Sequence, residues 1–398
     1  MYDLQLSPEQ RAIRDTVRDF VTREIKPVAL SPDRLEPFER PLPMALLDQA
    51  SGIGLRTLAL AEANGGAGAD ALTCCIVAEE LAVGDVDIAA VLAETSTLAG
   101  LLFDRLATAE QRDRFLPAFR DDPRCHLALA EHVPGTDTAL GVNYHRPIAG
   151  WADIGMQAVR ERNGAWVVNG GADGVANAAI AKIFVVAVGT AAADGGGAGV
   201  RLLLVPRDAP GLSVRAPDRE CHGACGTLVL SDCRVPEGNL LGGAGSLGCR
   251  APLAQAINLG IGRAAFEAAL DYARLRVQGG RRLIEHEAIG ARLADIAIRL
   301  EVARSAIWRA AWASDHPEAR ADGSLGDLPL ATIAHVVTSE LVYQAVRDAA
   351  ECFGAMGVMR DMPLAKYLHD ARVCLHSANG AGEARLRIAE ALAGYRRA

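Results

Sequence analysis

The sequence has little lysine and no excess of positive charge. Lysine occurs only at positions 26, 182 and 366, so arginine carries almost all of the positive charge. The formal net charge of the 398-residue chain is −8, which argues against nucleic acid or an anionic membrane surface as its main partner. We therefore expect a protein that binds neither.

Features of secreted and membrane proteins are also absent. The first residues, MYDLQLSPEQR, lack the basic start and apolar run of a signal peptide, and no apolar run approaches the length of a membrane span. The nine cysteines are scattered and odd in number, which is not the pattern of a disulfide framework. These absences predict a soluble protein of the cytoplasm.

The order of local patterns predicts the fold. At 398 residues the chain exceeds one simple core. Its first third shows helix starts of the capping-box type, at Ser7 to Gln10 and at Thr108 to Gln111. Residues from about 125 to 240 form short β-rich runs separated by Gly, Pro and Asp, among them KIFVVAVG and TLVLSDCRV. The segment AAADGGGAG, at 191–199, has the composition of a flexible hairpin tip.

From about residue 250 the pattern is helical again. Apolar residues recur by fours and threes in two segments, which are Ile289, Leu293, Ile296, Leu300, Ala303, Ile307 and Ala310, and then Leu330, Ile333, Val337, Leu341 and Ala345. With 252–276 and 383–393 these segments predict a four-helix bundle. The fold class is therefore mainly α with a central β-domain. We place an N-terminal helical domain at 1–123, a middle β-domain at 124–240 and a C-terminal helical bundle at 241–398.

Two short motifs have alternative interpretations. Cys221, His222 and Cys225, with Cys233 beyond, are spaced too irregularly for a zinc site, so we predict no metal. GIGRAA, at 260–265, fits the dinucleotide fingerprint, but that motif needs a preceding strand. Here APLAQAINL continues a helical pattern, so these glycines are expected to allow close helix packing.

Five ordered segments resemble the flavin-dependent acyl-CoA dehydrogenases, over nearly the whole chain. They are GIGLRTLALAEANGGAGADALTCCIVAEELA (52–82), LALAEHVPGTD (127–137), CRVPEGNLLGGAGSLG (233–248), RLRVQGGRRLIEHEAI (274–289) and ECFGAMGVMRDMPLAKYLHDAR (351–372). The resemblance implies the helical, β and bundle architecture of that family. It also implies FAD as cofactor and an acyl thioester as substrate, on CoA or on an acyl-carrier protein.

The same resemblance shows that the usual base is missing. In the family a carboxylate removes the α-proton of an acyl thioester while the flavin accepts the β-hydride. In CLHSANGAGEAR (374–385) the position of that carboxylate is held by Ala378, and a shift of one residue places Asn379 there. Some members carry the base early in the first bundle helix instead, but CRAPLAQAINLG (249–260) contains no acid.

The flavin contacts are also eroded. The resemblance aligns Ala130 with a Thr, Gly174 with a Trp, Ala176 with a Thr, Gly279 with a Phe and Glu351 with a Gln, and it aligns Gly380 and Gly382 with the Thr and Gln that follow the catalytic Glu. The contacts that remain, if FAD is bound, are Thr136, Arg276, Gln278 and His286. Each lost contact weakens binding by about 1 kcal/mol, so together the losses weaken it by orders of magnitude.

Three polar residues near these positions are candidates for acid–base work: His132, Asp173 and His376. The leading hypothesis is a diverged enzyme of specialised metabolism that performs a proton-transfer step, such as dehydration, cyclisation or isomerisation. A second is a non-catalytic subunit of a heteromer with an intact dehydrogenase. A third is an FAD-dependent dehydrogenase or oxygenase that uses a different base. We also expect a homodimer or homotetramer, because the bundle seams are complete.

Overall fold

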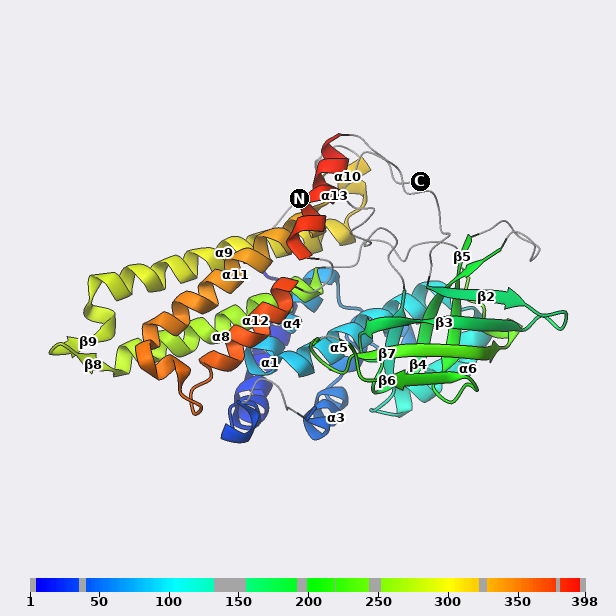
Figure 1. The fold of residues 1–398 in the computed structure, drawn as a ribbon, viewed down its shortest axis with the longest axis horizontal. Coiled ribbons are helices and arrows are strands. Elements are labelled where there is room, and N and C mark those ends of the chain that lie inside the picture. The colour runs from blue at the N-terminus through cyan, green and yellow to red at the C-terminus, as the bar shows by residue number, and fades with distance from the viewer. Residues whose placement is uncertain are drawn as a thin grey trace. The chain divides into compact units, whose positions relative to one another are not determined.

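The computed structural model describes residues 5–35, 41–131, 155–191, 199–218, 220–242, 252–321, 328–376 and 380–393 (Figure 1). The chain folds as two compact units that are discontinuous in sequence. One unit contains Met1–Leu42, Asp70–Ala90 and Cys249–Gly394, and the other contains Pro43–Ala69, Val91–Gly248 and Tyr395–Ala398. We call them the helical unit and the β unit. The domain boundaries at 123/124 and 240/241 stay predictions.

The β unit is built on a seven-stranded sheet. Its strands are β1 (His126–Ala130), β2 (Met156–Arg160), β3 (Trp166–Val175), β4 (Ala181–Thr190), β5 (Gly199–Pro206), β6 (Leu212–Arg215) and β7 (Gly226–Val235). The strand order is β1-β4-β2-β3-β7-β6, with β5 beside β4. Strand β4 runs parallel to β1 and antiparallel to β5, and Thr190 lies opposite Gly199. The predicted β-domain and its hairpin at 191–199 are therefore confirmed, although 192–198 lie outside the described residues.

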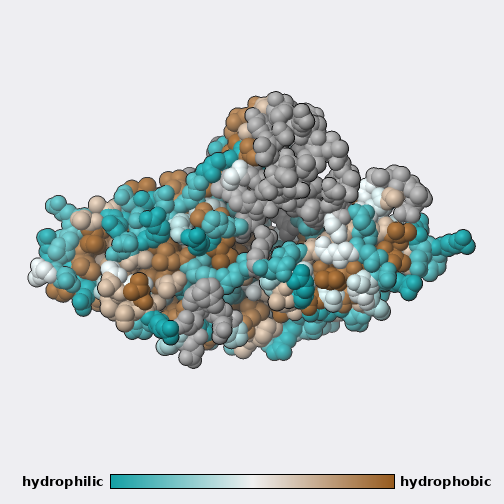
Figure 2. Space-filling view, in the orientation of Figure 1, coloured by the Kyte–Doolittle hydropathy of each residue, from teal (hydrophilic) through white to brown (hydrophobic). Residues whose placement is uncertain are grey.

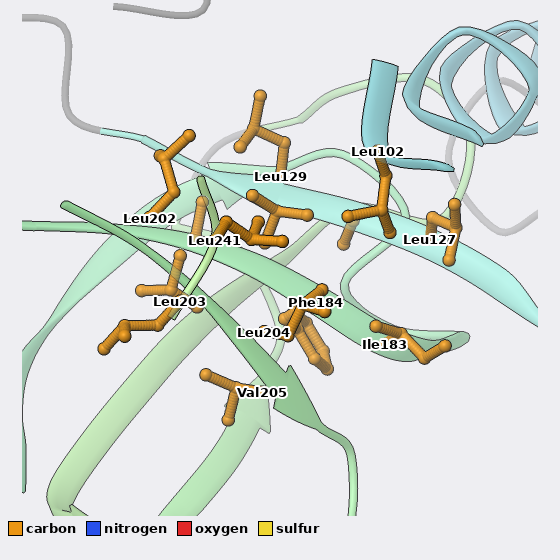
Figure 3. Packing of buried hydrophobic residues seen from close by; sticks show 14 of the residues in the cluster. Leu102, Leu127, Leu129, Ile183, Phe184, Leu202, Leu203, Leu204, Val205 and Leu241 are labelled. Atoms are coloured by element: carbon orange, nitrogen blue, oxygen red, sulfur yellow. The ribbon is translucent and has the colours of Figure 1, made fainter. Parts of the chain in front are cut away.

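Apolar side chains of the sheet and of nearby helices form the core of the β unit (Figure 3). Phe184 of β4 and Leu204 of β5 are fully buried, as is Leu102 of the helical segment that follows α5. A strand with one covered face alternates apolar and polar residues, whereas a strand with both faces covered is apolar throughout. The helical elements that contribute to this unit are α3 (Met44–Gly52), η3 (Leu55–Thr57), η4 (Glu62–Asn64), the later part of α5 (Val86–Ala99), η5 (Gly100–Leu106), α6 (Ala109–Asp121) and η6 (Glu237–Asn239).

The helical unit begins with α1 (Pro8–Phe20), η1 (Val21–Ile25), α2 (Lys26–Ala29), η2 (Pro32–Arg34) and α4 (Ala71–Gly84). Both predicted capping boxes are present. Ser7 Oγ accepts from the Gln10 amide at 3.0 Å and the Gln10 side chain accepts from the Ser7 amide at 3.0 Å. Thr108 and Gln111 repeat the arrangement at the start of α6 in the β unit.

The C-terminal bundle is confirmed. It contains α8 (Leu253–Leu275), β8 (Val277–Gln278), β9 (Arg281–Arg282), η7 (Leu283–Glu285), α9 (Glu287–Asp315), α10 (Glu318–Ala321), α11 (Leu330–Phe353), η8 (Gly354–Val358), α12 (Leu364–His376) and α13 (Gly380–Leu392). Helix α11 packs against both α8 and α9. Helix α12, which packs against α8 and α11, was not among the predicted helices, and α13 packs on α11.

The predicted seam of α9 is correct from Leu293 to Ala310, all of whose seam residues are buried. The seam of α11 is shifted from the prediction. Leu330 and Ala345 are buried, but Ile333, Val337 and Leu341 are only half-buried. The buried face of α11 is formed partly by polar residues instead, namely His335, Thr338 and Ser339.

The glycines of GIGRAA allow close helix packing, as predicted. Gly260 and Gly262 lie inside α8. A Cβ atom on Gly260 would lie 2.5 Å from the Glu79 carbonyl oxygen of α4, and one on Gly262 would lie 2.7 Å from Leu300 Cδ2 of α9. The segment is therefore a helix contact and has no strand before it, so it is not a dinucleotide fingerprint.

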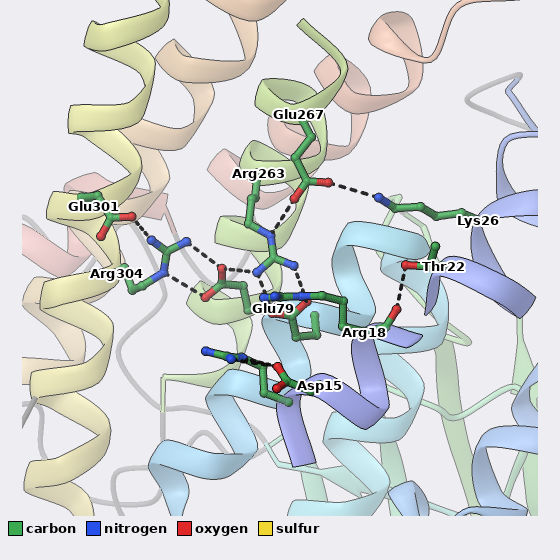
Figure 4. A network of polar contacts seen from close by, with 11 residues as sticks. Asp15, Arg18, Thr22, Lys26, Glu79, Arg263, Glu267, Glu301 and Arg304 are labelled. Carbon is green, nitrogen blue, oxygen red and sulfur yellow. Dashed lines mark hydrogen bonds and ion pairs between the residues drawn. The ribbon is translucent and has the colours of Figure 1, made fainter. Parts of the chain in front are cut away.

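Ion pairs join α1, α4, α8 and α9 (Figure 4). Glu79 accepts hydrogen bonds from Arg263 and Arg304, both at 2.8 Å. Glu80 accepts from Arg18 at 2.7 Å and from Arg263. Burial alone would raise the pKa of Glu80, but the hydrogen bonds from Arg263 and Arg18 outweigh it and hold that pKa below its ordinary value.

One expectation about apolar runs was wrong. The helical stretch Val86–Leu106 is long and apolar enough, by length and composition, to cross a membrane. In this protein 67% of its apolar window is buried, which is typical of a core helix. This stretch is not obvious in the sequence because Asp87, Glu94 and Asp104 interrupt its apolar residues.

Candidate functional site

The connection from α8 to α9 is a basic hairpin formed by strands β8 and β9 (Figure 1). Val277 pairs with Arg282 and Gln278 with Arg281. The two residues of the turn, Gly279 and Gly280, have φ values of +63° and +82°, a region that only glycine adopts without strain. The sequence QGGR therefore produces a tight turn immediately after a long helix.

His286 fixes the shape of this hairpin. Its Nε2–H donates to the Gln278 carbonyl oxygen at 3.0 Å, and its Nδ1 accepts from Arg281 Nε at 3.3 Å. His286 is also the last residue before α9. The structure thus brings together three of the predicted flavin contacts, Arg276, Gln278 and His286, but gives His286 a structural role within the hairpin.

The hairpin presents positive charge to solvent. Arg276, Arg281 and Arg282 are exposed, and none of the three is ion-paired within the described part of the chain. Guanidinium groups in this setting suit phosphate oxygens. Glu351, on the last turn of α11, is also exposed and adds a carboxylate where the resemblance expects an uncharged Gln.

Apolar side chains surround the base of the hairpin. The Phe353 ring at the end of α11 stacks on Tyr272 of α8, with centroids 4.3 Å apart. Leu275 is 81% exposed and Val277 58% exposed beside the hairpin, and Val358 is 81% exposed beyond α11. Figure 2 shows hydrophobic patches between hydrophilic ones along the bundle.

The β unit carries the positions that the resemblance assigns to the flavin ring. Ala130, the last residue of β1, is fully buried and has no polar side-chain atom. Gly174 has a φ of +63°, so a Trp at this position would be strained. Just beyond it, the buried Asn177 amide donates to the Val91 and Leu127 carbonyl oxygens and fixes the turn.

Asp173 is held by its own unit. Its carboxylate accepts from the Thr227 hydroxyl and from the Asp218 amide, the latter at 3.2 Å. Asp218 in turn pairs with Arg215. These contacts give the Asp173 side chain a role in joining β3 to the segment after β6, and they make it a poor candidate for a mobile base.

The other predicted acid–base residues are less well placed by the structure. His376 is the last residue of α12 and is exposed. His132, Thr136 and Ala378 lie outside the described residues. Asp173 belongs to the β unit and His376 to the helical unit.

Sequence reasoning missed one histidine. His335 lies in the second turn of α11 and is 9% exposed, and its Nδ1 accepts a hydrogen bond from Gln255 Nε2 of α8 at 2.9 Å. Desolvation by burial, with a further contribution from Arg387, lowers the pKa of His335. The signal available in the sequence was a histidine within an otherwise largely apolar helical segment, LATIAHVVTSELV.

Other candidate sites are accounted for structurally. A cavity of about 560 Å³ lies beside the ion pairs of Glu79 and Glu80, but both carboxylates are already bound by arginines. Within the described ranges, no group of three or more His, Cys, Asp or Glu side chains could hold a metal ion. The Cys225 thiol donates to the His222 carbonyl oxygen at 3.3 Å.

The described residues fit only part of an FAD molecule. The basic hairpin suits the phosphates, although Glu351 opposes them. The positions for the isoalloxazine ring do not fit, because Ala130 offers no side-chain donor and Gly174 has a backbone that disfavours an aromatic residue. At these two described positions the redox-bearing half of the cofactor would find no side-chain partner.

Models of known families match most of the chain. The acyl-CoA dehydrogenase N-terminal domain matches residues 7–121, the middle domain matches 147–233, and the C-terminal domain matches 246–392. The order of these matches is the order of helices, strands and bundle in the structure.

Individual relatives agree with the domain matches. The chain is 28% identical to an acyl-CoA dehydrogenase of Bacillus subtilis, over 93% of this chain and 94% of that protein. It is 29% identical to benzylmalonyl-CoA dehydrogenase of Aromatoleum aromaticum, over 94% and 95%. Butyryl-CoA dehydrogenase from Megasphaera elsdenii has the same fold, with a TM-score of 0.81 at 22% identity over 98% of this chain and all of that one. The structure of PigA with FAD and proline gives 0.80 at 21% identity over 99% and 100%. Together with the three domain matches, these similarities show that the chain belongs to the acyl-CoA dehydrogenase family.

Proposed function

We propose that the protein binds an acyl thioester, on CoA or on an acyl-carrier protein, and catalyses a proton-transfer step without flavin redox chemistry. Dehydration, cyclisation and isomerisation are the reaction types that need no electron acceptor. The protein would act in the cytoplasm, in specialised metabolism, as a diverged member of its family.

The proposal rests on which residues stand at the positions that the resemblance assigns to the flavin ring. Ala130 and Gly174 supply neither hydrogen bonds nor a stacking surface from their side chains. The resemblance places Ala378, or Asn379 with a shift of one residue, at the position of the usual base. The packing contacts of the same fold are retained, including the close approach of α8 to α4 at Gly260. Losses confined to one site favour a change of chemistry over general decay.

Dehydration illustrates the balance of such a reaction. A base takes the α-proton of a β-hydroxyacyl thioester, the electron pair forms the α,β double bond, and the β-hydroxide leaves with a proton as water. No oxidant or reductant is consumed. Hydrogen bonds to the thioester carbonyl stabilise the enolate-like charge that develops.

Exchange of the α-proton tests the proposed function. The purified protein is incubated in D₂O with 3-hydroxybutyryl-CoA and with butyryl-CoA, and deuterium incorporation and water loss are followed by mass spectrometry. Enzyme-dependent exchange without oxidation is the expected result. A protein that oxidises butyryl-CoA with an added electron acceptor would contradict the proposal.

The Ala378→Glu variant extends this test. A carboxylate at that position restores the usual base but supplies no hydride acceptor, so we expect no oxidation of short, medium or branched acyl-CoA even with added FAD. Oxidation above the level of the parent protein would show a functional flavin site.

A second function is favoured by one observation, the exposed hairpin. Arg276 and Gln278 are retained on a surface flanked by exposed Leu275 and Val277, and in the family the corresponding arginine reaches flavin phosphates across a subunit boundary. The chain could therefore complete the flavin site of an intact dehydrogenase. Co-expression with an intact acyl-CoA dehydrogenase chain, followed by purification through one tag, would give a stable heteromer in that case and two separate proteins otherwise.

A further inference from the structure

The helical unit contains a cavity of about 560 Å³ that plays no part in the proposed function. All of the residues that line it belong to this unit. Helices α1, α4, α8 and α9 each line it with residues three or four positions apart, such as Arg14 and Arg18 of α1. Residues with this spacing share one face of a helix. Four helix faces therefore meet around a space large enough for a small molecule.

The acids of the cavity are already paired. Glu79 and Glu80 are buried, and the carboxylate of each accepts hydrogen bonds from two arginines (Figure 4). The side chains of the other two lining acids, Glu267 and Glu301, are 42% and 69% exposed, and each is paired with an arginine of the cavity. A cation would have to displace an arginine from one of these acids, so the cavity does not favour a cation.

Two arginines of α1 keep unused donors at the cavity. Arg14 donates only to Asp15, its neighbour in the sequence, through Nε at 2.9 Å and Nη2 at 2.8 Å. Arg18 donates to Glu80 through the same two atoms. Among the described residues, neither Nη1 atom has a hydrogen-bond partner. The Asp15 side chain is 60% exposed, and an ion pair of this kind contributes little, so Arg14 loses little when it turns to a ligand.

The cavity also has apolar lining. Leu6, Ile76 and Trp308 line it beside the charged groups. Trp308 is half-buried, and its indole N–H donates to none of the residues that the structure describes. An indole N–H is a donor only and is usually paired when the ring is buried. The group that would pair with it is therefore a hydrogen-bond acceptor.

Unused donors beside an apolar wall define the chemistry of a ligand. A carboxylate has two oxygen atoms that accept several hydrogen bonds, and its bonds from guanidinium groups are strong. We propose that this cavity binds an organic carboxylate with an aliphatic or aromatic body. The carboxylate accepts from Arg14 and Arg18 of α1 and from the Trp308 indole of α9, and the body contacts Leu6 and Ile76. This binding site is additional to the proposed function and does not depend on it.

Octanoate is a suitable probe, because it combines a carboxylate with an apolar chain. We expect saturable binding to the full-length protein with a Kd below about 1 mM, detected by calorimetry and by a change in tryptophan fluorescence. Octylamine has the same chain with the opposite charge, and inorganic phosphate has negative charge without a chain. Both should bind at least about tenfold more weakly. No binding of octanoate, or binding of either control as tight as that of octanoate, would overturn the proposal.

Two arginine variants locate the carboxylate. Arg14→Gln should weaken octanoate binding about tenfold or more, and the protein should stay folded because Arg14 pairs only with an exposed side chain. Arg23→Gln is the matched control, since Arg23 pairs with exposed Asp19 and does not line the cavity. Affinity should be unchanged in this control. Equal affinities in the two variants would overturn the proposal, including the case in which octanoate occupies the site of the proposed function as an acyl mimic.

A tryptophan variant locates the ligand independently. Trp308→Phe keeps an aromatic ring and removes the indole N–H, so the fluorescence change on addition of octanoate should disappear. Calorimetry should still detect binding, weakened about threefold to tenfold. A fluorescence change of the same size in Trp308→Phe and the parent protein would mean that octanoate binds elsewhere, and it would overturn the assignment of the cavity.

Discussion

At the scale of single residues, glycine is used in this chain for two different reasons. Gly260 allows α8 to touch the backbone of α4, since a Cβ there would lie 2.5 Å from the Glu79 carbonyl oxygen. Gly290, inside α9, has an ordinary φ, and among the described residues a Cβ there would have only the Ile284 carbonyl oxygen within 4 Å, at 3.8 Å. The two positions share a helical backbone but differ in the space around them.

Matched alanine substitutions should therefore have opposite effects. Gly260→Ala forces two helices apart and should lower the free energy of unfolding by about 1–3 kcal/mol. Gly290→Ala should raise it by about 0.5–1 kcal/mol through helix propensity. Urea unfolding followed by circular dichroism measures both, and a Gly260→Ala protein as stable as the parent would contradict the close packing.

A second residue-scale prediction concerns His126 of β1. The residue is 1% exposed, and its Nδ1 lies 3.1 Å from Thr95 Oγ1. Burial, and then the charge of Arg56, lower the pKa of His126 to about 4. Because the unfolded chain binds a proton at its ordinary pKa of 6.5, the stabilisation is complete above pH 6.5 and is lost as the pH falls toward 4.

The free energy of unfolding, measured from pH 7 to pH 4, tests the direction of this pH dependence. The parent protein should lose up to about 3 kcal/mol more than His126→Asn over that range. Parallel curves for the two proteins would show that His126 titrates with the same pKa in the folded and unfolded states.

At the scale of elements, the ion pairs of Figure 4 hold α4 against three other helices. The side chains of Glu79 and Arg304 are 5% and 19% exposed, whereas Glu301, a second partner of Arg304, is 69% exposed. Removing one member of a buried pair leaves the other charge without compensation, and removing an exposed partner does not.

Two substitutions, each at a glutamate that pairs with Arg304, separate these cases. Glu79→Gln should lower the free energy of unfolding by about 3 kcal/mol or more, and Glu301→Gln by less than about 1 kcal/mol. Equal effects in chemical denaturation would mean that burial does not distinguish the two pairs.

The elements also show what could be read from the sequence. Capping boxes at Ser7 and Thr108 and the strands from 126 to 235 were predictable, because each depends on local chemistry. Helix α12 and the buried His335 were not, since both depend on contacts between distant segments. The predicted buried face of α11 was wrong because it was based on the apolar residues alone, whereas the structure also buries Thr338 and Ser339.

At the scale of the whole molecule, the exposed apolar residues of the bundle predict assembly. Leu275, Val277 and Val358 lie on the surface of the helical unit, and Ile333 and Val337 of α11 are only half-buried. A second copy of the chain would cover such residues.

We therefore expect at least a dimer. Light scattering coupled to size-exclusion chromatography, at micromolar concentration, should give a homodimer or homotetramer. A monomer would contradict this, and it would favour the heteromer described above.

The central claim is that this chain keeps the fold of a flavin enzyme but not the flavin chemistry. The most direct test is the flavin content of freshly purified protein, measured by absorbance after denaturation and removal of the protein. Our account predicts well below one FAD per chain, because the ring positions at Ala130 and Gly174 supply no side-chain contacts. A yellow protein that releases one FAD per chain would contradict it.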